Sequence, residues 1–172
     1  MVNFGNIPVY ALRFMVIYFI VTNAIAMALF PGGTLFHPEL EIYSFSENFF
    51  SDLGITFTKD GTQNYLSSFL FNSSLLVLGL CAVTHVFVPK LFKENKKSYI
   101  LSIIAAILFV IAGLSFIGVG LTPADIYFEE HVWFVIFAFN AQTIGVLFMT
   151  IAFLLSKVSN KYTVVAFIYF IN

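Results

Sequence analysis

The sequence predicts an all-α integral membrane protein, a polytopic bundle of transmembrane helices. Three observations predict this fold class: 60% of the 172 residues are apolar, only 10% are charged, and the mean hydropathy is +0.95. An ordinary globular domain carries about 25% charged residues, because its surface faces water. The composition therefore excludes a soluble fold of this size, and we expect a single membrane domain over residues 1–172.

Four apolar stretches are long enough to cross a membrane. About 17 to 25 mostly apolar residues are needed to span the roughly 30 Å of hydrocarbon in a bilayer. The expected spans cover about residues 11–30, 66–88, 99–121 and 132–155. The second span stops at Pro89, and the third contains no charged residue.

A fifth apolar stretch covers residues 162–172, where the sequence stops. About ten residues of helix reach only about 15 Å, so a terminal carboxylate would lie near the centre of the bilayer. A charge there costs at least about 2.5 kcal/mol. We therefore expect a C-terminally truncated chain, with one or two further spans completing a six- or seven-span bundle.

Basic and acidic residues separate onto two sides of the expected spans. One side holds seven of the eight basic residues: Arg13, Lys90, Lys93, Lys96, Lys97, Lys157 and Lys161. The other side holds eight of the nine acidic residues: Glu39, Glu41, Glu47, Asp52, Asp60, Asp125, Glu129 and Glu130. Short loops rich in Lys and Arg stay in the cytoplasm. We expect a cell-membrane protein with a cytoplasmic N-terminus and an outer loop over residues 31–65.

The first span has an alternative interpretation as a removable signal peptide. Ala26-Met27-Ala28 resembles a small-residue cleavage site after an apolar run. Against cleavage, Arg13 is the only positive charge before this run, and the run is longer than a usual signal core. We expect the span to be retained.

The outer loop is too long to be a bare connector. Ser44 to Glu47 has the spacing of a helix-starting capping box, and Gly54 can end a helix in the left-handed conformation. Four apolar residues between these signals fall on one helical face: Phe45, Phe49, Phe50 and Leu53. We expect a short interfacial helix on the outer leaflet or over the mouth of the bundle. It would serve as a lid that only packs, or as a gate for a substrate.

Polar residues inside the spans share one depth. Asn23, Asn72, Ser115 and Asn140 each lie about 9 to 13 Å from the outer end of their span, with Ser73, Ser74 and Gln142 nearby in depth. Such residues often join neighbouring helices, at about 0.6 kcal/mol per hydrogen bond. Alternatively, they line an outward-facing polar cavity that receives a lipid headgroup or a small solute. Either role predicts that all four face the bundle interior.

His131 begins the fourth span on a stripe of small residues. His131, Ala138, Gly145 and Ala152 recur every seven residues, and Ala106, Gly113 and Gly120 repeat the device in the third span. Small residues allow close helix approach, so we expect His131 to point into the bundle. Its imidazole titrates near neutral pH and is suited to an acid, a base or a ligand. The plainer alternative is a helix cap or a bond to a carboxylate such as Asp125.

Other chemistries are excluded or leave no motif. His85 lies at the cytoplasmic end of its span, so it cannot join His37 and His131 in a zinc site. The single Cys81 excludes a disulfide within the chain and a multi-cysteine metal site. No phosphate-binding loop or serine-nucleophile motif is present. We expect no cofactor and no metal, and the net charge of −1 argues against a nucleic-acid partner.

The basic run from Lys90 to Lys97 has two interpretations. It fixes the topology of the chain through the positive-inside rule. Alternatively, it contacts anionic lipid headgroups. We favour the topological role.

Three short segments, in this order, resemble a known family. They are Ser46 to Gly54 (SENFFSDLG), Phe71 to Leu75 (FNSSL) with Gly79, and Gly118 to Pro123 (GVGLTP) followed by His131. This order is similar to the prokaryotic membrane family known as domain of unknown function 998, over about residues 10 to 155. The resemblance implies a six- or seven-span helical bundle without an assigned activity. It singles out Asn48, Ser51, Asp52, Gly54, Asn72, Pro123 and His131.

Two classes of function follow. In the first, which we favour, a non-enzymatic protein binds a membrane lipid or small solute at an outward-facing cavity, or serves as an accessory subunit of a membrane-protein partner. Its candidate binding residues are Asn23, Asn48, Ser51, Asn72, Ser115 and Asn140. In the alternative, an intramembrane hydrolase acts on a lipid headgroup with His131 and Asp52 as acid and base. Catalysis would need these two groups within about 3 Å, or one water further apart.

The charge separation gives a direct test of topology. A cysteine introduced at Lys59 should react with a membrane-impermeant thiol reagent on intact cells, while one at Lys96 should not. Lys96 lies in a loop rich in lysine, and such loops stay in the cytoplasm. Labelling at Lys96 and protection at Lys59 would contradict the orientation.

Overall fold

The computed structural model describes residues 7–34, 37–157 and 160–171. Of these residues, 74% are helical, and they contain no strand beyond one isolated bridge that pairs Phe57 with Gln63. The predicted all-α class is therefore confirmed. The predictions about residues before 7 and after 171 lie outside the described residues.

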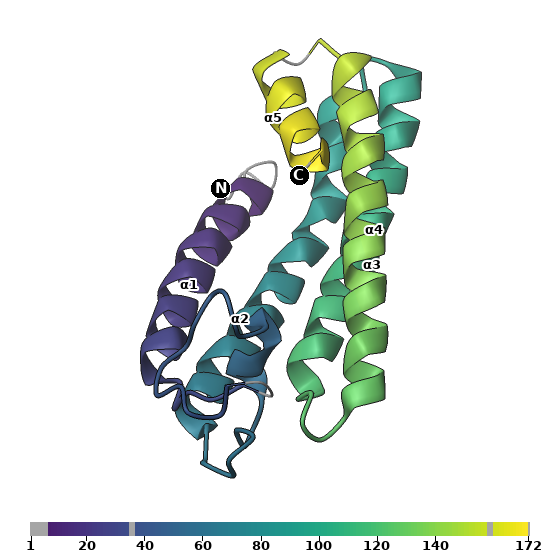
Figure 1. The fold of residues 1–172 in the computed structure, drawn as a ribbon. Helices are drawn as coiled ribbons and strands as arrows, with labels where there is room; N and C mark the ends of the chain where they lie inside the picture. Colours follow the sequence, from purple (N-terminus) through teal and green to yellow (C-terminus); the bar gives the residue numbers. More distant parts are fainter. Residues whose placement is uncertain (1–6, 35–36, 158–159, 172) are drawn as a thin grey trace. The chain divides into compact units, whose positions relative to one another are not determined.

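Five α-helices and two 3₁₀-helices make up the described chain (Figure 1). In chain order they are α1 (Ile7–Leu29), η2 (Phe50–Gly54), α2 (Tyr65–Ala82), η3 (Val83–Phe92), α3 (Lys96–Leu121), α4 (Phe128–Leu154) and α5 (Asn160–Ile171). Four helical segments of the described chain are long and apolar enough to cross a membrane: α1, α2 continued by η3, α3 and α4. The four predicted full spans are confirmed at this level.

All four helical segments extend beyond the predicted spans, and α1 and α3 do so by beginning at Ile7 and Lys96. α4 begins at Phe128, four residues before the apolar stretch, and has Glu129 and Glu130 in its first turn. Carboxylates there interact favourably with the positive end of the helix dipole, so the helix extends beyond its apolar part. The second span does not stop at Pro89, because α2 continues as η3 to Phe92.

The chain forms two compact units, each built from several helical segments. Unit 1 comprises Met1–Arg13, Gly79–Ser115 and Ile136–Asn172, and unit 2 comprises Phe14–Leu78 and Phe116–Val135. Each of the four predicted full spans therefore contributes residues to both units.

The core of unit 1 lies where η3, α3 and α4 pack together. Phe92, Ala105, Met149 and Ala152 are buried there, and the ring of Phe92 lies 5.4 Å from that of Phe153. Ala105 and Ala152 are fully buried, so their small side chains let the helices approach. The core thus combines one large ring with small neighbours.

The turn between η3 and α3 is tied to the end of α4 through one side chain. Asn95 Oδ1 accepts hydrogen bonds from the Lys97 and Ser98 N–H groups, at 2.9 and 3.3 Å, and so caps α3. Its Nδ2 donates to the Leu155 carbonyl at 2.8 Å. A single asparagine therefore fixes two chain reversals of unit 1 against each other.

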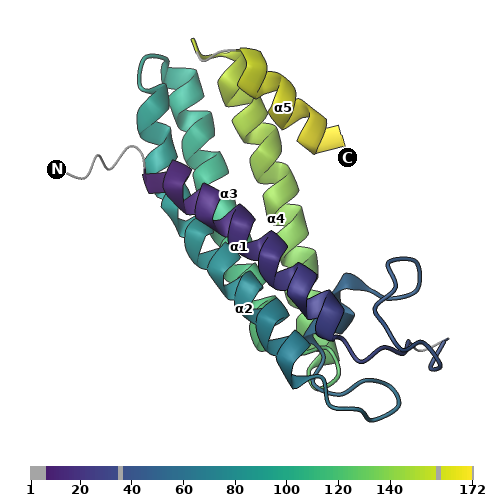
Figure 2. The same cartoon turned by 90° about the vertical axis from the view of Figure 1, so that its left-hand side faces the viewer.

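Unit 2 joins α1 and α2 through polar side chains. Tyr18 Oη lies 3.2 Å from Ser73 Oγ, and Asn23 Nδ2 donates to Ser74 Oγ at 3.0 Å. Figures 1 and 2 show the unit 2 part of α1 running beside α2, with the long connecting loop at the end where the two helices are joined. These contacts set the geometry of the candidate site described below.

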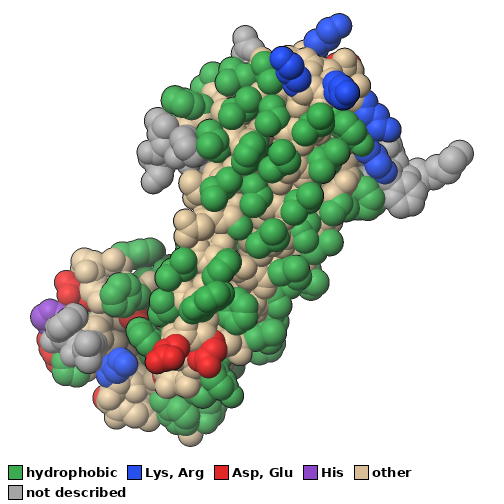
Figure 3. Space-filling model, turned by 90° about the vertical axis from the view of Figure 1, so that its right-hand side faces the viewer, with side chains coloured by type: hydrophobic (Ala, Val, Ile, Leu, Met, Phe, Trp, Pro, Cys, Tyr) green, Lys and Arg blue, Asp and Glu red, His purple; other side chains and the backbone are tan. Residues whose placement is uncertain are grey.

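Much of the surface of the described helices is apolar. Ile17 and Ile20 of α1 are 65% and 62% exposed, and hydrophobic side chains cover much of the face shown in Figure 3. A protein in water rarely exposes such continuous apolar surface. The four long helices therefore carry the surface expected of membrane-spanning segments.

The predicted small-residue stripes are confirmed. All seven members are buried: Ala106, Gly113, Gly120, His131, Ala138, Gly145 and Ala152. A Cβ on Gly113 would lie 2.6 Å from Ala82 Cβ and 2.8 Å from the Gly79 carbonyl oxygen. Only glycine permits this contact between α3 and α2.

This contact predicts that Gly113→Ala destabilises the folded protein by about 1–3 kcal/mol, because overpacking forces the backbones apart. Thermal unfolding in detergent measures the loss. Gly145→Ala is the matched control, because its Cβ would meet Phe109 ring atoms no closer than 3.1 Å, and that side chain can shift. Both substitutions gain the same helix propensity. Equal stability of the two variants would contradict the close approach.

Candidate functional site

The long loop, residues 30–64 between α1 and α2, has its own hydrogen-bonded fold. Its first reversal needs positive φ angles at Gly32 (94°) and Gly33 (78°), which glycine adopts without strain. The Gly33 N–H donates to the Leu40 carbonyl at 2.6 Å. The ring of His37 lies between two carboxylates, 3.1 Å from Glu39 and 3.4 Å from Glu47. The loop is thus a folded element rather than a bare connector.

The helix predicted to begin at Ser44 begins later in the structure. Residues 45–47 form a turn, and η2 begins only at Phe50. Asn48 Oδ1 accepts the Ser44 N–H at 3.0 Å, and Asp52 Oδ2 accepts the Phe49 N–H at 2.9 Å. These local side-chain bonds compete with the helix at the expected start and cap a shorter helix at Phe49.

The four apolar side chains of this segment do not share one face. Phe45 and Phe49 are 79% and 76% exposed, whereas Leu53 is fully buried. The ring of Phe50 contacts Phe71 of α2, with centroids 5.1 Å apart. Only part of the expected apolar face is therefore free for a membrane surface.

Side chains of α2, and of Asn64 just before it, donate hydrogen bonds to the carbonyl groups at the end of η2. Asn64 Nδ2 donates to the Leu53 and Ile55 carbonyls at 3.1 and 2.9 Å. Ser67 Oγ donates to the Leu53 carbonyl, and Ser68 Oγ and Asn72 Nδ2 donate to the Gly54 carbonyl, over 2.8 to 3.2 Å. The role of Asn72 is thus to bind loop backbone.

Gly54 is required for close approach rather than for a left-handed helix end. Its φ is not positive, and the chain continues at Ile55 in an extended conformation. A Cβ on Gly54 would lie 2.6 Å from the Phe71 ring and 2.7 Å from Asn72 Oδ1. The glycine lets η2 lie directly on α2.

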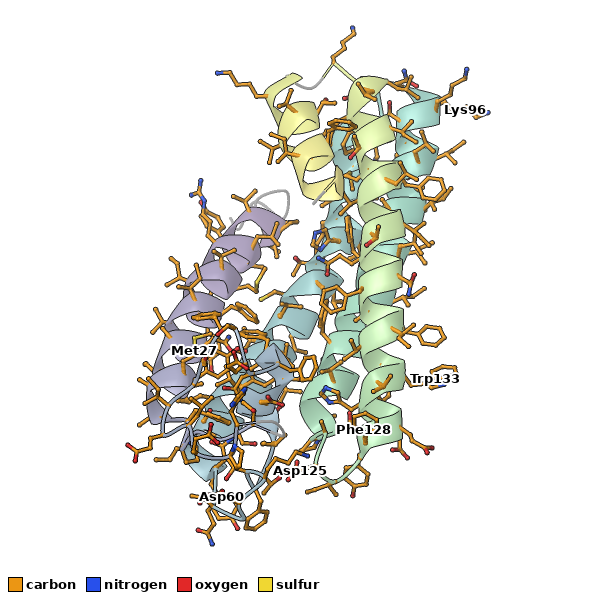
Figure 4. The ribbon with its side chains drawn as sticks, viewed as in Figure 1. Met27, Asp60, Lys96, Asp125, Phe128 and Trp133 are labelled. Atoms are coloured by element: carbon orange, nitrogen blue, oxygen red, sulfur yellow. The ribbon has the colours of Figure 1, made fainter. Side chains whose placement is uncertain are left out.

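Asp125 joins the long loop to the loop between α3 and α4. Its Oδ2 accepts the N–H groups of Thr56 and Phe57 at 2.9 and 3.0 Å. Figure 4 shows Asp125 in the α3–α4 loop, beside the long loop. Sequence reasoning placed Asp125 near His131 and missed this role, because a carboxylate that binds distant backbone leaves no local pattern.

His131 is buried as expected, at 5% exposure, but it is not paired with a carboxylate. Its Nδ1 lies 2.7 Å from the Thr122 carbonyl oxygen, which can only accept, so the proton is on Nδ1. Its Nε2 is buried without a hydrogen-bond partner among the described residues. The ring therefore links the start of α4 to the end of α3.

The predicted convergence of Asp52, Asn72 and His131 is not formed by the described hydrogen bonds. Asp52 Oδ2 accepts from Asn48 Nδ2 and the Phe49 N–H, within its own segment. Ser51 is half-buried beside it. The pKa of the Tyr43 hydroxyl is raised, first by burial and then by the charge of Asp52. Asp52 thus acts as a capping carboxylate of the long loop.

The predicted polar layer divides between the units. Asn23 is 4% exposed and Asn72 is half-buried, both in unit 2. Ser115 and Asn140 belong to unit 1 and donate to carbonyls of their own helices, those of Ile111 and Ile136. Asn140 is exposed, which differs from the expected inward orientation. An amide that bonds the carbonyl four residues earlier does not need an interior partner.

The structure brings four residues together in a polar seam between α1 and α2, which we call the α1–α2 polar seam: Tyr18, Asn23, Ser73 and Ser74. Asn23 Nδ2 donates to the Phe19 carbonyl at 2.7 Å as well as to Ser74 Oγ. Asn23 Oδ1 is buried and has no partner among the described residues. Tyr18 and Ser73 are half-buried at the same seam. The depth of Ser73 and Ser74 had indicated this region, but Tyr18 had given no signal.

No group of three or more metal-ligating side chains occurs within the described ranges. A hollow of about 280 Å³ lies at the start of α4, lined by Glu129, Glu130, Trp133 and Phe134. Figure 4 shows Trp133 projecting away from its helix. This arrangement supplies charge and aromatic surface but no ligand set for a metal.

Two carboxylates of the long loop have lowered pKa values. Hydrogen bonds from the Thr58 hydroxyl, the Thr62 N–H and the Thr62 hydroxyl lower the pKa of Asp60. Backbone hydrogen bonding, followed by the His37 ring, lowers the pKa of Glu39. A lowered folded pKa stabilises the loop above the unfolded value of about 4, and this is lost as pH falls through the folded value. Both carboxylates therefore favour the folded loop at neutral pH.

The bonds of Asp125 predict a local opening when they are removed. Asp125→Ala should lower the hydrogen-exchange protection of the Thr56 and Phe57 N–H groups about fivefold, since a net hydrogen bond contributes about 1 kcal/mol. Asp125→Asn should keep most of the protection, because its side-chain oxygen still accepts. Glu129→Ala, which removes an exposed carboxylate of α4, is the control. Unchanged protection in Asp125→Ala would show that the contact does not hold the loop.

Comparison with known proteins adds no relative: no protein-family model, curated protein or solved structure matches this chain. The resemblance to the domain of unknown function 998 family therefore stays a prediction. The finding that stands without it is a chain with four helices able to cross a membrane and a hydrogen-bonded loop over two of them.

Proposed function

We propose that this chain is a multi-pass membrane protein that binds the headgroup of a membrane lipid, or a small polar solute, at the α1–α2 polar seam. The observation that carries the proposal is the buried, unpartnered Asn23 Oδ1 of the described structure. A buried acceptor without a donor costs about 1–3 kcal/mol. A hydroxyl or ammonium group of a ligand would supply that donor.

The neighbours of Asn23 suit such a ligand. Tyr18 Oη and Ser73 Oγ are half-buried and can each donate or accept. The exposed side chains of Ile17 and Ile20 on the same helix offer an apolar surface for acyl chains. A phospholipid has both a polar headgroup and acyl chains, so it fits this seam better than a fully polar solute.

The orientation follows from the charges. With the N-terminus in the cytoplasm, the seam lies in the outer half of the membrane and the long loop lies outside. Phe45 and Phe49, both mostly exposed, then reach the headgroup region, where aromatic rings are favoured. The loop would form a fixed cap over the seam, which also suits an accessory subunit that presents this surface to a partner protein.

Binding is better supported than hydrolysis. The carboxylate of Asp52 is held by Asn48 and the Phe49 N–H, and His131 Nδ1 is held by the Thr122 carbonyl. An acid–base pair needs reach of about 3 Å, or one intervening water. Asp52 is thus held within its own segment and His131 is held against the end of α3, which favours a structural role for both.

Lipid retention tests the proposed seam. Wild-type protein purified in detergent with added phosphatidylethanolamine should keep this lipid in native mass spectra. Asn23→Ala should retain up to about tenfold less, because a hydrogen bond of about 0.5–1.5 kcal/mol is lost. Asn140→Ala removes an exposed asparagine from α4 and should retain as much as the wild type.

Size-exclusion profiles and unfolding temperatures without lipid show whether each variant folds. Asn23→Ser keeps a smaller polar group and should retain an intermediate amount. Equal retention by folded Asn23→Ala and Asn140→Ala would contradict binding at the seam.

A further inference from the structure

Six lysines gather in unit 1, from three segments of the chain. Lys90 lies in the last turn of η3, Lys93 follows η3, Lys96 and Lys97 begin α3, Lys157 follows α4, and Lys161 lies in the first turn of α5. We call these six residues the lysine cluster. All six are exposed, and Figure 3 shows blue side chains gathered over this part of the molecule. Glu94 lies in the same turn, but no ion pair between a carboxylate and these six lysines is formed within the described ranges.

The hydrogen bonds of Asn95 bring the lysines of two turns together. Its side chain caps α3 at Lys97 and also binds the Leu155 carbonyl, two residues before Lys157. Lys90 is held by a cation–π contact within η3, with its Nζ 5.2 Å from the centre of the Phe87 ring. The concentration of positive charge is therefore a feature of the fold.

The position of these lysines opposes the local helix electrostatics. Lys96 and Lys97 occupy the first turn of α3, and Lys161 that of α5, and neither turn contains an acidic residue. Cations are disfavoured at the positive end of a helix dipole. An external anion would relieve both this unfavourable placement and the repulsion among the lysines.

The apolar surface beside the cluster indicates what that anion is attached to. Leu91, Ile100 and Leu154 are 60%, 47% and 63% exposed, and each lies within a few residues of a cluster lysine. Lysine side chains at such a boundary extend along apolar surface and keep the ammonium group in water. Charge next to an exposed apolar belt matches a lipid phosphate above its acyl chains.

We propose that the lysine cluster binds the phosphate groups of anionic phospholipids at the membrane surface. The binding surface is the end of unit 1 that carries the turn between η3 and α3 and the residues after α4. This goes beyond the proposed function, because it uses other residues, in unit 1, and selects a lipid by charge. It also assigns the basic run a binding role that topology alone does not require.

Detergent-purified protein separates binding from topology, since no insertion takes place in the assay. The test adds equimolar phosphatidylglycerol and phosphatidylcholine and counts retained lipids by native mass spectrometry. Wild-type protein should prefer phosphatidylglycerol at least tenfold at low ionic strength. The quadruple variant K93Q/K96Q/K97Q/K157Q should lose this preference, because each basic residue contributes about fivefold to such association. The preference should also fall as salt is added.

Matched variants make the outcome specific. The K93R/K96R/K97R/K157R variant keeps the charge and should keep the preference, and K59Q in the long loop should match the wild type. Asn23→Ala should also keep it, so failure here and failure at the seam are distinguishable. Equal retention of both lipids by the wild type would overturn the proposal. So would a preference that survives in the folded glutamine variant, or full displacement by an equal concentration of soluble glycerol 3-phosphate, which would show a site for phosphate alone.

Discussion

The arrangement of unit 2 depends on how three backbone carbonyl groups, those of Leu53, Gly54 and Ile55, obtain hydrogen-bond donors. The carbonyls lie at the buried side of η2, and asparagine and serine side chains from α2 and its start supply the donors. A buried carbonyl without a donor is costly, and lipid supplies none. The loop can therefore rest on an apolar helix only because that helix carries polar groups at the right positions. The same requirement explains Gly54, since any side chain there would hold these partners apart.

The amino-acid pattern predicts the helices well because membrane spans must satisfy two strong conditions at once. They need length and continuous apolarity, and both are readable along the chain. The two buried stripes, which include Gly113 in α3 and Gly145 in α4, were also predictable, since close helix contact needs small residues at regular spacing. The loop was less predictable. Asn48 and Asp52 can bond the backbone in several local ways, and only the complete fold selects one.

The candidate site shows where residue type and depth stop being informative. Asn23 and Asn140 have the same side chain and similar expected depths, yet one is buried against Ser74 and the other is exposed on its own helix. Helix rotation decides between these outcomes, and highly apolar spans give little indication of rotation because most faces look alike. Asp125 presents the opposite difficulty. Its partners are backbone N–H groups almost 70 residues away, at Thr56 and Phe57, and any residue type there would offer the same donors.

Because η3 is a 3₁₀-helix of ten residues, the number of residues in this segment is constrained. A 3₁₀-helix has three residues per turn, so its side chains stand in straight columns. Residues three apart lie in the same column. Pro89 and Phe92 are the last two residues of one column and are buried, and Phe87 and Lys90 lie in the neighbouring column. Deleting one residue before Pro89 would bring Lys90 and Lys93 to the two buried places. Deleting three would restore the columns but shorten the segment by about 6 Å. Over this segment, we expect the protein to tolerate changes of residue type more readily than changes of residue number.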